Sequence, residues 1–371
     1  ALTLLEAPVL GFILSFIIRY IPDPGSDKYI FFENENIPIY IFMSLIVALF
    51  LGLTISAEEI FRDRKILKRE RFLSLSRGSY LLSKIAVLII ISAVQVTLFL
   101  AIANPVLELK GLFLKYFIAL FATSFCANML GLNISASFNS AITIYIVIPL
   151  VIIPMMVLSG AMFPFDKLNR AIGSVDKVPV IAEIMPTRWT YEALMVAQFK
   201  DNKYNRYSDS TSGKTVYEYK QDQSIANYYL IKLLPALNAA ISRTEPLLSN
   251  PEPDFSPEAR NNENMKGNRE DLKLIGNELR NLNMRFPSLR PFRYIDELMP
   301  GKYNSIVHAN LKSYISFVES SFTRIENRVT GSWDEFYLAN RNEIKRLENK
   351  YHNLKLQEIV TKFYERDKNK I

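Results

Sequence analysis

The chain has 371 residues, of which 49% are hydrophobic and 22% are charged, and its formal net charge is +7. These averages would suit a soluble protein, but apolar residues crowd the first 165 or so positions and charged residues the remainder, so two unlike parts are expected. A single cysteine, Cys126, excludes a disulfide framework. The histidines His308 and His352 lie far apart, without cysteines or carboxylates at ligand spacing, which argues against a metal site.

The first apolar run covers residues 2–21, close to the roughly 20 residues that cross a bilayer as a helix. It lacks the basic start and the small-residue cleavage site of a secretory signal, so we interpret it as a membrane helix. Residues 22–37 are polar, acidic and rich in turn formers, which predicts a loop. A second apolar run at 38–56 predicts a second span.

A basic connector follows between Ala57 and Lys84, with eight Lys and Arg residues against four acids. Short Lys- and Arg-rich loops stay in the cytoplasm, so the connector predicts the orientation of the chain. Residues 57, 60, 61 and 67 share one helical face, although Arg64 intrudes on it. This pattern predicts a helix along the inner membrane surface with one face free for a partner. A solvated loop that only sets topology fits the charge equally well.

Three more apolar runs follow at 80–104, 112–135 and 140–163. Asn104 and Pro105 form a stop signal after the first of them. Small residues between 131 and 140 predict close helix packing, and the prolines of the last run predict a kinked helix. Five spans that start in the cytoplasm leave the chain outside.

After Pro164 the chain becomes amphipathic. Pro186 predicts the start of a helix, on which Arg188 and Glu192 lie four residues apart on one face. The polar stretch that follows predicts helices over 221–243, 270–284 and 302–329. Residues 249–268, rich in Pro, Asn and Glu, predict a linker. Ser332 and Glu335 have the spacing of a capping box, which predicts a long final helix beginning there.

Several ordered motifs go beyond hydropathy. The connector reads EEIFRDRKILKRER at 58–71 and then LSRGSYLLSK at 75–84; later segments read GLNISA at 131–136, LSGAMFP at 158–164 and PTRWTYEAL at 186–194. Over about residues 1 to 200, this order resembles the permease half of bacterial ABC exporters of the G type, the type-2 ABC transporter permeases. The sequence departs from that family where its sixth span should follow, because a polar stretch of roughly 170 residues runs to Ile371 instead.

The resemblance implies roles for particular residues. The connector would couple to an ATP-binding domain through Glu58, Glu59, Arg62, Arg64, Arg69, Glu70 and Arg71. A substrate cavity between two permeases would be lined by Phe42, Ile46, Pro149, Ile153 and Met156. Met162 would lie at the outer gate, and Arg188 and Glu192 would pair on an external helix. ATP and magnesium would bind the associated ATP-binding domain, and this chain would hold no cofactor or metal.

The expected fold class is therefore all-α, with a polytopic membrane domain at 1–165 that includes a coupling helix at 57–78. External re-entrant helices are expected at 166–200 and an extracytoplasmic helical domain at 201–371, inserted before a sixth span beyond the chain end. The predicted function is the permease part of an ATP-driven exporter of lipid-like or amphipathic substrates in a bacterial inner membrane. Its expected partners are the ATP-binding domain, a second permease and membrane lipids, and not nucleic acid. The alternative is a membrane-anchored structural or signalling protein whose external helical domain binds a partner.

Overall fold

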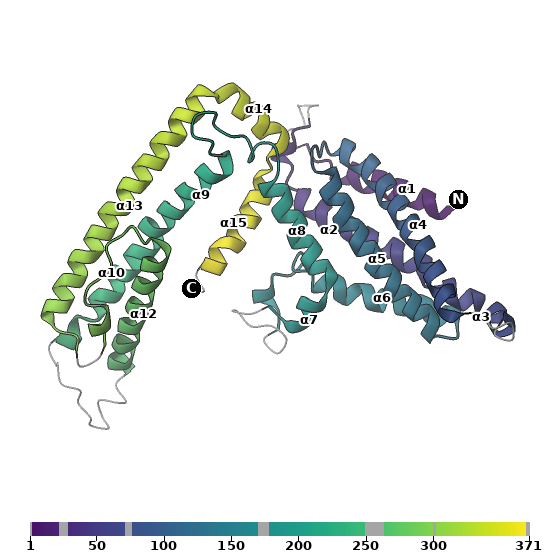
Figure 1. Cartoon of the computed structure of the whole chain (residues 1–371), viewed down its shortest axis with the longest axis horizontal. Coiled ribbons are helices and arrows are strands. Elements are labelled where there is room, and N and C mark those ends of the chain that lie inside the picture. The colour runs from purple at the N-terminus through teal and green to yellow at the C-terminus, as the bar shows by residue number, and fades with distance from the viewer. Residues whose placement is uncertain are drawn as a thin grey trace. The chain divides into compact units, whose positions relative to one another are not determined.

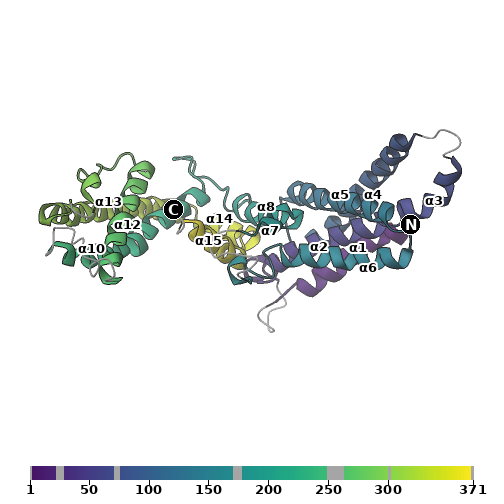
Figure 2. The same cartoon turned by 90° about the horizontal axis from the view of Figure 1, so that it is seen from below.

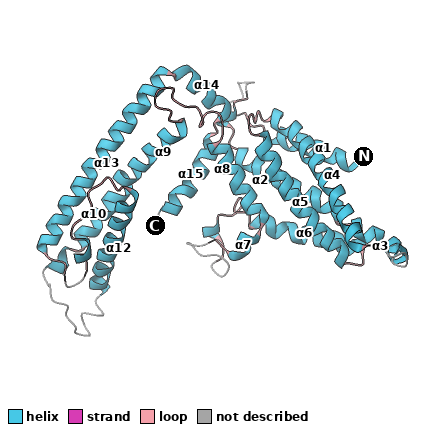
Figure 3. Ribbon diagram, in the orientation of Figure 1, coloured by secondary structure: helices cyan, strands magenta, loops and turns pink. Residues whose placement is uncertain are grey.

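A computed structural model describes residues 2–21, 29–70, 76–169, 178–248, 263–299 and 302–368. The described residues form helices and no β-strand, which confirms the all-α prediction (Figures 1 and 3). They divide into two compact units. Unit 1 holds the chain up to Tyr207 together with Asn342–Arg366, and unit 2 holds Ser208–Arg341. A late stretch of the sequence thus packs with the apolar part of the chain.

The apolar helices of unit 1 are α1 (Leu2–Ile18), α2 (Ile37–Ser56), α4 (Arg77–Val106), α5 (Phe113–Ser137) and α6 (Ala141–Val157) (Figure 2). Among the described residues, three helical runs are long and apolar enough to cross a membrane: Ile37–Arg69, α4 and α5. α1 and α6 have 17 residues each, at the lower end of the range of about 17–25 that spans hydrocarbon. These helices confirm the predicted polytopic membrane domain.

α2 and α5 approach closely because small residues face each other. A Cβ atom on Gly131 would lie 1.9 Å from Ser56 Oγ, and one on Gly52 would lie 2.6 Å from the carbonyl oxygen of Ser124. Both distances are shorter than any real contact, so only glycine allows the helices to meet at these points. The packing role predicted for the small residues near position 131 is confirmed.

The remaining elements of unit 1 are short or amphipathic. They are η1 (Phe31–Glu33), α3 (Glu59–Glu70), η3 (Phe165–Lys167), α7 (Val180–Ile184), α8 (Pro186–Lys200), α14 (Arg341–Tyr351) and α15 (Leu354–Lys368). α14 begins at the boundary between the two units. Pro186 is the first residue of α8, as predicted, because proline is compatible with the first turn of a helix.

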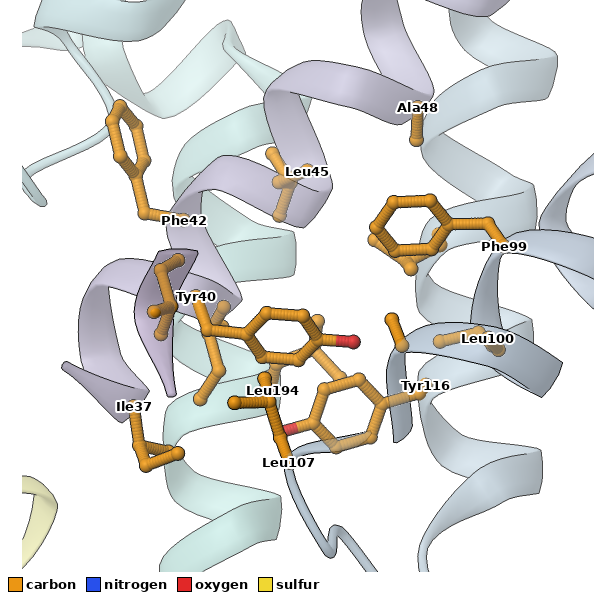
Figure 4. Packing of buried hydrophobic residues seen from close by; sticks show 14 of the residues in the cluster. Ile37, Tyr40, Phe42, Leu45, Ala48, Phe99, Leu100, Leu107, Tyr116 and Leu194 are labelled. Carbon is orange, nitrogen blue, oxygen red and sulfur yellow. The ribbon is translucent and has the colours of Figure 1, made fainter. Parts of the chain in front are cut away.

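The core of unit 1 joins residues from α2, α4, α5 and α8 (Figure 4). It is not purely apolar, because two fully buried tyrosines satisfy their hydroxyl groups there. Tyr40 donates to Asn104 Oδ1 at 3.0 Å, and Tyr116 donates to Gln198 Oε1 at 3.0 Å. Such bonds between helices add specificity to packing that apolar side chains alone leave loosely defined.

Unit 2 consists of α9 (Val216–Asn227), the π-helical turn η4 (Tyr228–Leu233), α10 (Leu234–Arg243), η5 (Glu245–Leu248), α12 (Glu263–Arg285), η6 (Ile295–Glu297) and α13 (Ser305–Ala339). It has a separate apolar core of buried residues from α10, α12 and α13, which includes Leu272, Ile275, Leu311 and Ile315. The predicted helices over 221–243, 270–284 and 302–329 are confirmed. Of the linker predicted at 249–268, residues 249–262 lie outside the described residues, whereas residues 263–268 are not a linker and belong to α12.

The prediction of a helix starting at Ser332 is wrong. α13 runs without a break through Ser332 to Ala339, because the Gly331 that precedes it costs a helix only about 1 kcal/mol. A capping box does occur elsewhere, at Thr215 and Glu218, where it opens α9. The spacing of a capping box therefore marks a helix start only where the preceding residues cannot continue a helix.

Candidate functional site around α3

α3 is fixed at its first turn by a residue from another helix. Ser135 of α5 is completely buried, and its hydroxyl oxygen accepts hydrogen bonds from the backbone N–H groups of Ile60 (3.0 Å) and Phe61 (2.8 Å). Free N–H groups at a helix start need such an acceptor, which is usually supplied by a residue just before the helix. Here it comes from 75 residues further along the chain.

The end of α5 is in turn satisfied by α3. Arg64 donates from its guanidinium to the carbonyl oxygens of Ser135 (3.3 Å) and Ala136 and to Asn139 Oδ1. These carbonyls belong to the last turn of α5. Carbonyl groups in that turn have no hydrogen-bond donor within the helix, and they lie at the negative end of the helix dipole. α3 and α5 thus cap each other. This explains why Arg64 interrupts the apolar face of the predicted connector helix.

A lysine ties α3 to α4. Lys84 Nζ lies 2.6 Å from Glu59 Oε2 and 2.8 Å from Asp63 Oδ2, which are one turn apart on α3. Tyr80 OH also donates to Asp63 Oδ2, at 3.0 Å. The three charged side chains are each only about a quarter exposed, so solvent screens these pairs less than pairs on an open surface. α6 contributes a further bond, from Tyr145 OH to Glu58 Oε1.

The opposite face of α3 is exposed and basic. It carries Arg62, Lys65, Ile66, Lys68 and Arg69, all of them exposed. The Arg62 side chain is 69% exposed and forms an ion pair with Glu59 at 3.3 Å, within the same helix. We call these five residues the outer face of α3. α3 is therefore held on one side by α4 and α5 and open on the other, and α6 is bonded to Glu58 just before it.

The predicted coupling residues divide between these two faces. Glu58, Glu59 and Arg64 contact neighbouring helices, whereas Arg62 and Arg69 lie on the outer face. Arg71 and the side chain of Glu70 lie outside the described residues. Sequence reasoning missed Ser135, Asp63, Tyr80 and Lys84. Lys84 was visible only as one more basic residue, and Ser135 only as one more small residue.

The predicted cavity residues do not gather in one place within this chain. Phe42 is buried and makes an edge-on ring contact with Tyr191 of α8, with centroids 6.2 Å apart. Ile46 and Met156 also pack against the core of unit 1. Pro149 and Ile153 are instead exposed on α6.

Met162, predicted at the outer gate, is exposed, as is its neighbour Phe163. Arg188 and Glu192 form the predicted pair across one turn, with 4.0 Å between Nη2 and Oε2. Arg188 also lies 3.9 Å from Glu183 Oε1 and stacks over the ring of Trp189 at 4.4 Å. Its side chain is only 12% exposed. Arg188 therefore has more partners than the simple helix pair that the spacing predicts.

α5 is also bonded to α8, along the first half of its length. Thr123 donates to Thr190 Oγ1 at 3.0 Å, and Tyr116 makes the buried bond to Gln198. Lys115 pairs with Asp201, just after α8. Burial raises the pKa of the Asp201 carboxyl, but its bonds to Lys115 and Arg206 outweigh this and hold the pKa below its usual value. The carboxylate is thus the stable form.

The segments that lead out of and back into unit 1 are clasped together. Tyr204 OH donates to Glu348 Oε1 at 3.1 Å, and its ring lies 4.9 Å from that of His352. Asn353 donates to the carbonyl oxygens of Phe31 (2.9 Å) and Asn34 (2.7 Å). We call this group of residues the clasp. No local pattern in the sequence indicates it, because its members are separated by as many as 322 positions.

This arrangement defines a class of protein: a polytopic helical membrane domain with a short helix held at one end and open on its outer side. The chain belongs to the ABC-2 type transporter family, which matches residues 1–199. The family match supports a membrane component of a transporter. This confirms the resemblance to type-2 ABC permeases.

The chain is also similar to an ABC transporter ATP-binding/permease protein of Mycobacterium tuberculosis. The two are 25% identical over 182 residues, which cover 46% of this chain and 19% of that protein. The chain thus spans about a fifth of the length of this relative. No solved structure matches the chain.

Proposed function

We propose that this chain is the permease of an ATP-driven exporter, and that the ATP-binding domain docks on the outer face of α3. One observation carries the proposal: α3 leaves a basic face exposed while its other face is bonded to α4 and α5, and Glu58, just before α3, is bonded to α6. A body that pushes on this outer face would move the ends of those helices. An acidic surface on the partner would complement Arg62, Lys65, Lys68 and Arg69.

The charge of the connector supports the orientation. Lys- and Arg-rich loops stay in the cytoplasm, so α3 faces the cytoplasm of a bacterial inner membrane and residues 166–371 lie outside. ATP and magnesium bind the partner, where hydrolysis occurs. The relative's printed name joins ATP-binding and permease parts in one protein, which supports a partner of this kind. The transported substrate is lipid-like or amphipathic, moved outward by alternating access.

A second copy of the permease completes the translocation path. Pro149 and Ile153 are exposed on α6, so in this chain alone they face no cavity. In a homodimer, the α6 helices of two copies would bring these residues to a shared path, with Met162 towards its outer end. Membrane lipids cover the other exposed apolar residues of the membrane helices.

Charge reversal on the outer face tests the docking proposal. We expect the double substitution Arg62→Glu with Arg69→Glu to lower ATP hydrolysis by the whole transporter in proteoliposomes by roughly tenfold or more, because close interfacial charge pairs are worth about 1.5 kcal/mol or more. The matched control, Arg62→Lys with Arg69→Lys, keeps both charges and should retain most activity. Equal hydrolysis by the reversed and the control proteins would contradict docking at this face.

The alternative function, a membrane-anchored binding protein, is favoured by one observation. Unit 2 has its own apolar core, separate from that of the membrane helices. In that case the proteoliposomes would show no ATP hydrolysis that depends on this chain, and its activity would be binding to unit 2. The proteoliposome measurement therefore separates the two functions.

A further inference from the structure

α5 is bonded at both ends to elements that take part in the proposed function. At one end, Ser135 accepts from the first turn of α3 and the last carbonyls of α5 accept from Arg64. Near the other end Tyr116 donates to Gln198 of α8, and closer to the middle of α5 Thr123 donates to Thr190 of α8. α5 is thus shared between the helix proposed to meet the ATP-binding domain and the helix that precedes unit 2.

The body of α5 is suited to transmit a displacement. It is one unbroken α-helix from Phe113 to Ser137 with no proline inside, whereas α6 contains Pro149 and Pro154. From Tyr116 to Ser135 it rises about 30 Å at 1.5 Å per residue. Its buried residues form one stripe along its length, packed against neighbouring helices. A helix packed in this way moves as a rigid body, because close-packed interiors do not deform continuously.

The α8 end of α5 continues into the clasp. Asn202 donates to the carbonyl oxygen of Gln198 at 3.0 Å, which holds the chain after α8 in place. Two residues later, Tyr204 meets Glu348 and His352. Both segments through which the chain leaves and re-enters unit 1 are therefore joined to the end of α8. A shift of α8 would reach both connections to unit 2 together.

We propose that α5 carries movement of α3 to α8 and to the clasp, with Ser135 and Tyr116 as positioning residues at its two ends. This inference rests on the proposed function, in which α3 meets the ATP-binding domain. Through α5, the nucleotide state of that domain controls the clasp.

Amide hydrogen exchange on the whole transporter, permease and ATP-binding domain together in nanodiscs, tests the proposal. Exchange over 57–70 and 198–207 is compared between the nucleotide-free state and the state trapped with ATP and vanadate. We expect both segments to change with nucleotide in the wild type. In Ser135→Ala, the change over 57–70 remains and the change over 198–207 falls at least twofold. Ser137→Ala is the matched control, since Ser137 donates within its own helix to Asn133, and it should behave as wild type.

Tyr116→Phe breaks the other end of the path while keeping the ring in the core, so it guards against misfolding of the Ser135 variant. It too should leave the α3 response intact and weaken the response over 198–207. An undiminished response over 198–207 in both variants would overturn the role of α5, as would a wild type in which only 57–70 responds. A wild type in which 57–70 does not respond to nucleotide would instead overturn the proposed docking on α3, and the inference with it.

Discussion

The side-chain amide of Asn353 donates to the backbone carbonyl oxygen of Asn34 at 2.7 Å, across 319 positions of sequence. Asn353 also caps α15, because its Oδ1 accepts from the backbone N–H of Leu356 at 2.9 Å. Both asparagines are buried. One side chain thus starts a helix and fixes it to the segment between α1 and α2.

Removing this amide should release α15 from unit 1. We expect Asn353→Ala to destabilise the docked segment by about 2–4 kcal/mol, the sum of a lost helix cap and a buried carbonyl left without a donor. Amide exchange over 354–361 should rise accordingly. Asn310→Ala is the control, because Asn310 is exposed and donates only along its own helix, to Ile306. Equal exchange over 354–361 in the two variants would show that Asn353 does not hold α15.

The contact between α2 and α5 predicts opposite effects for two glycine substitutions. Gly131→Ala places a methyl group 1.9 Å from Ser56 Oγ, so the helices must separate at a cost of about 1–3 kcal/mol. Gly331→Ala, in an open part of α13 with no atom within 4 Å of the added methyl group, should stabilise its helix by up to about 1 kcal/mol. Thermal unfolding in detergent measures both. A neutral Gly131→Ala would contradict the close packing.

Lys84 is predicted to hold α3 against α4. Lys84→Met leaves the partly buried carboxylates of Glu59 and Asp63 without their shared cation, so amide exchange over 59–70 should rise several-fold. Lys110→Met removes a surface pair with Glu108, at 3.3 Å, and such pairs are worth about 0–1 kcal/mol. No change in exchange for Lys84→Met would mean that Ser135 and Arg64 suffice to hold α3.

Unit 2 should lose stability as the pH falls below about 6.5, the ordinary pKa of histidine. Burial lowers the pKa of His308, nearby Lys312 lowers it further, and Glu245 opposes both. The unfolded chain therefore takes up a proton before the folded chain does, and folding is penalised progressively down to the folded pKa. The bond to Lys312 lowers the pKa of Glu245. Protonation of Glu245 therefore reduces the stability of unit 2 only at a more acidic pH.

Exchange over 305–322 at pH 7.5 and 5.5, corrected for the intrinsic effect of pH on amide exchange, measures this effect. His308→Gln can still bond to Tyr303, which contacts His308 Nδ1 in the wild type, but has no proton to gain. It should show a smaller change between the two pH values. The same change in both proteins would assign the pH dependence to another group.

The sequence predicted most of the helices because their patterns are local. Hydropathy and length placed α2, α4 and α5 to within a few residues, and the basic connector indicated α3. The capping-box spacing at Ser332 gave a wrong helix start, because the helix propensity of the residues before it was strong enough for α13 to continue through this position. Rules based on local sequence succeed where neighbouring residues determine the structure. They fail where a capping pattern lies inside a longer helix.

The contacts of the site could not be predicted in the same way. The sequence shows Arg64 only as a charge on the apolar face of the connector helix. Its partners could not be predicted, because they lie 71 or more positions away in the sequence. Ser135 is one of several small residues in that region, and nothing in its neighbourhood distinguishes a cap from a packing residue. The clasp is even harder to predict from local sequence, because it joins three separate stretches of the chain.

If the outer face of α3 meets an ATP-binding domain, that domain must cover Ile66, which lies on this face and is 54% exposed. With the single native cysteine replaced (Cys126→Ser), Ile66→Cys can be labelled with a maleimide in membranes. We predict that labelling is fast for the permease alone and falls at least tenfold when the ATP-binding domain is present. Ile231→Cys in unit 2, 69% exposed, should label equally in both preparations. Labelling of Ile66→Cys that does not depend on the ATP-binding domain would contradict the account.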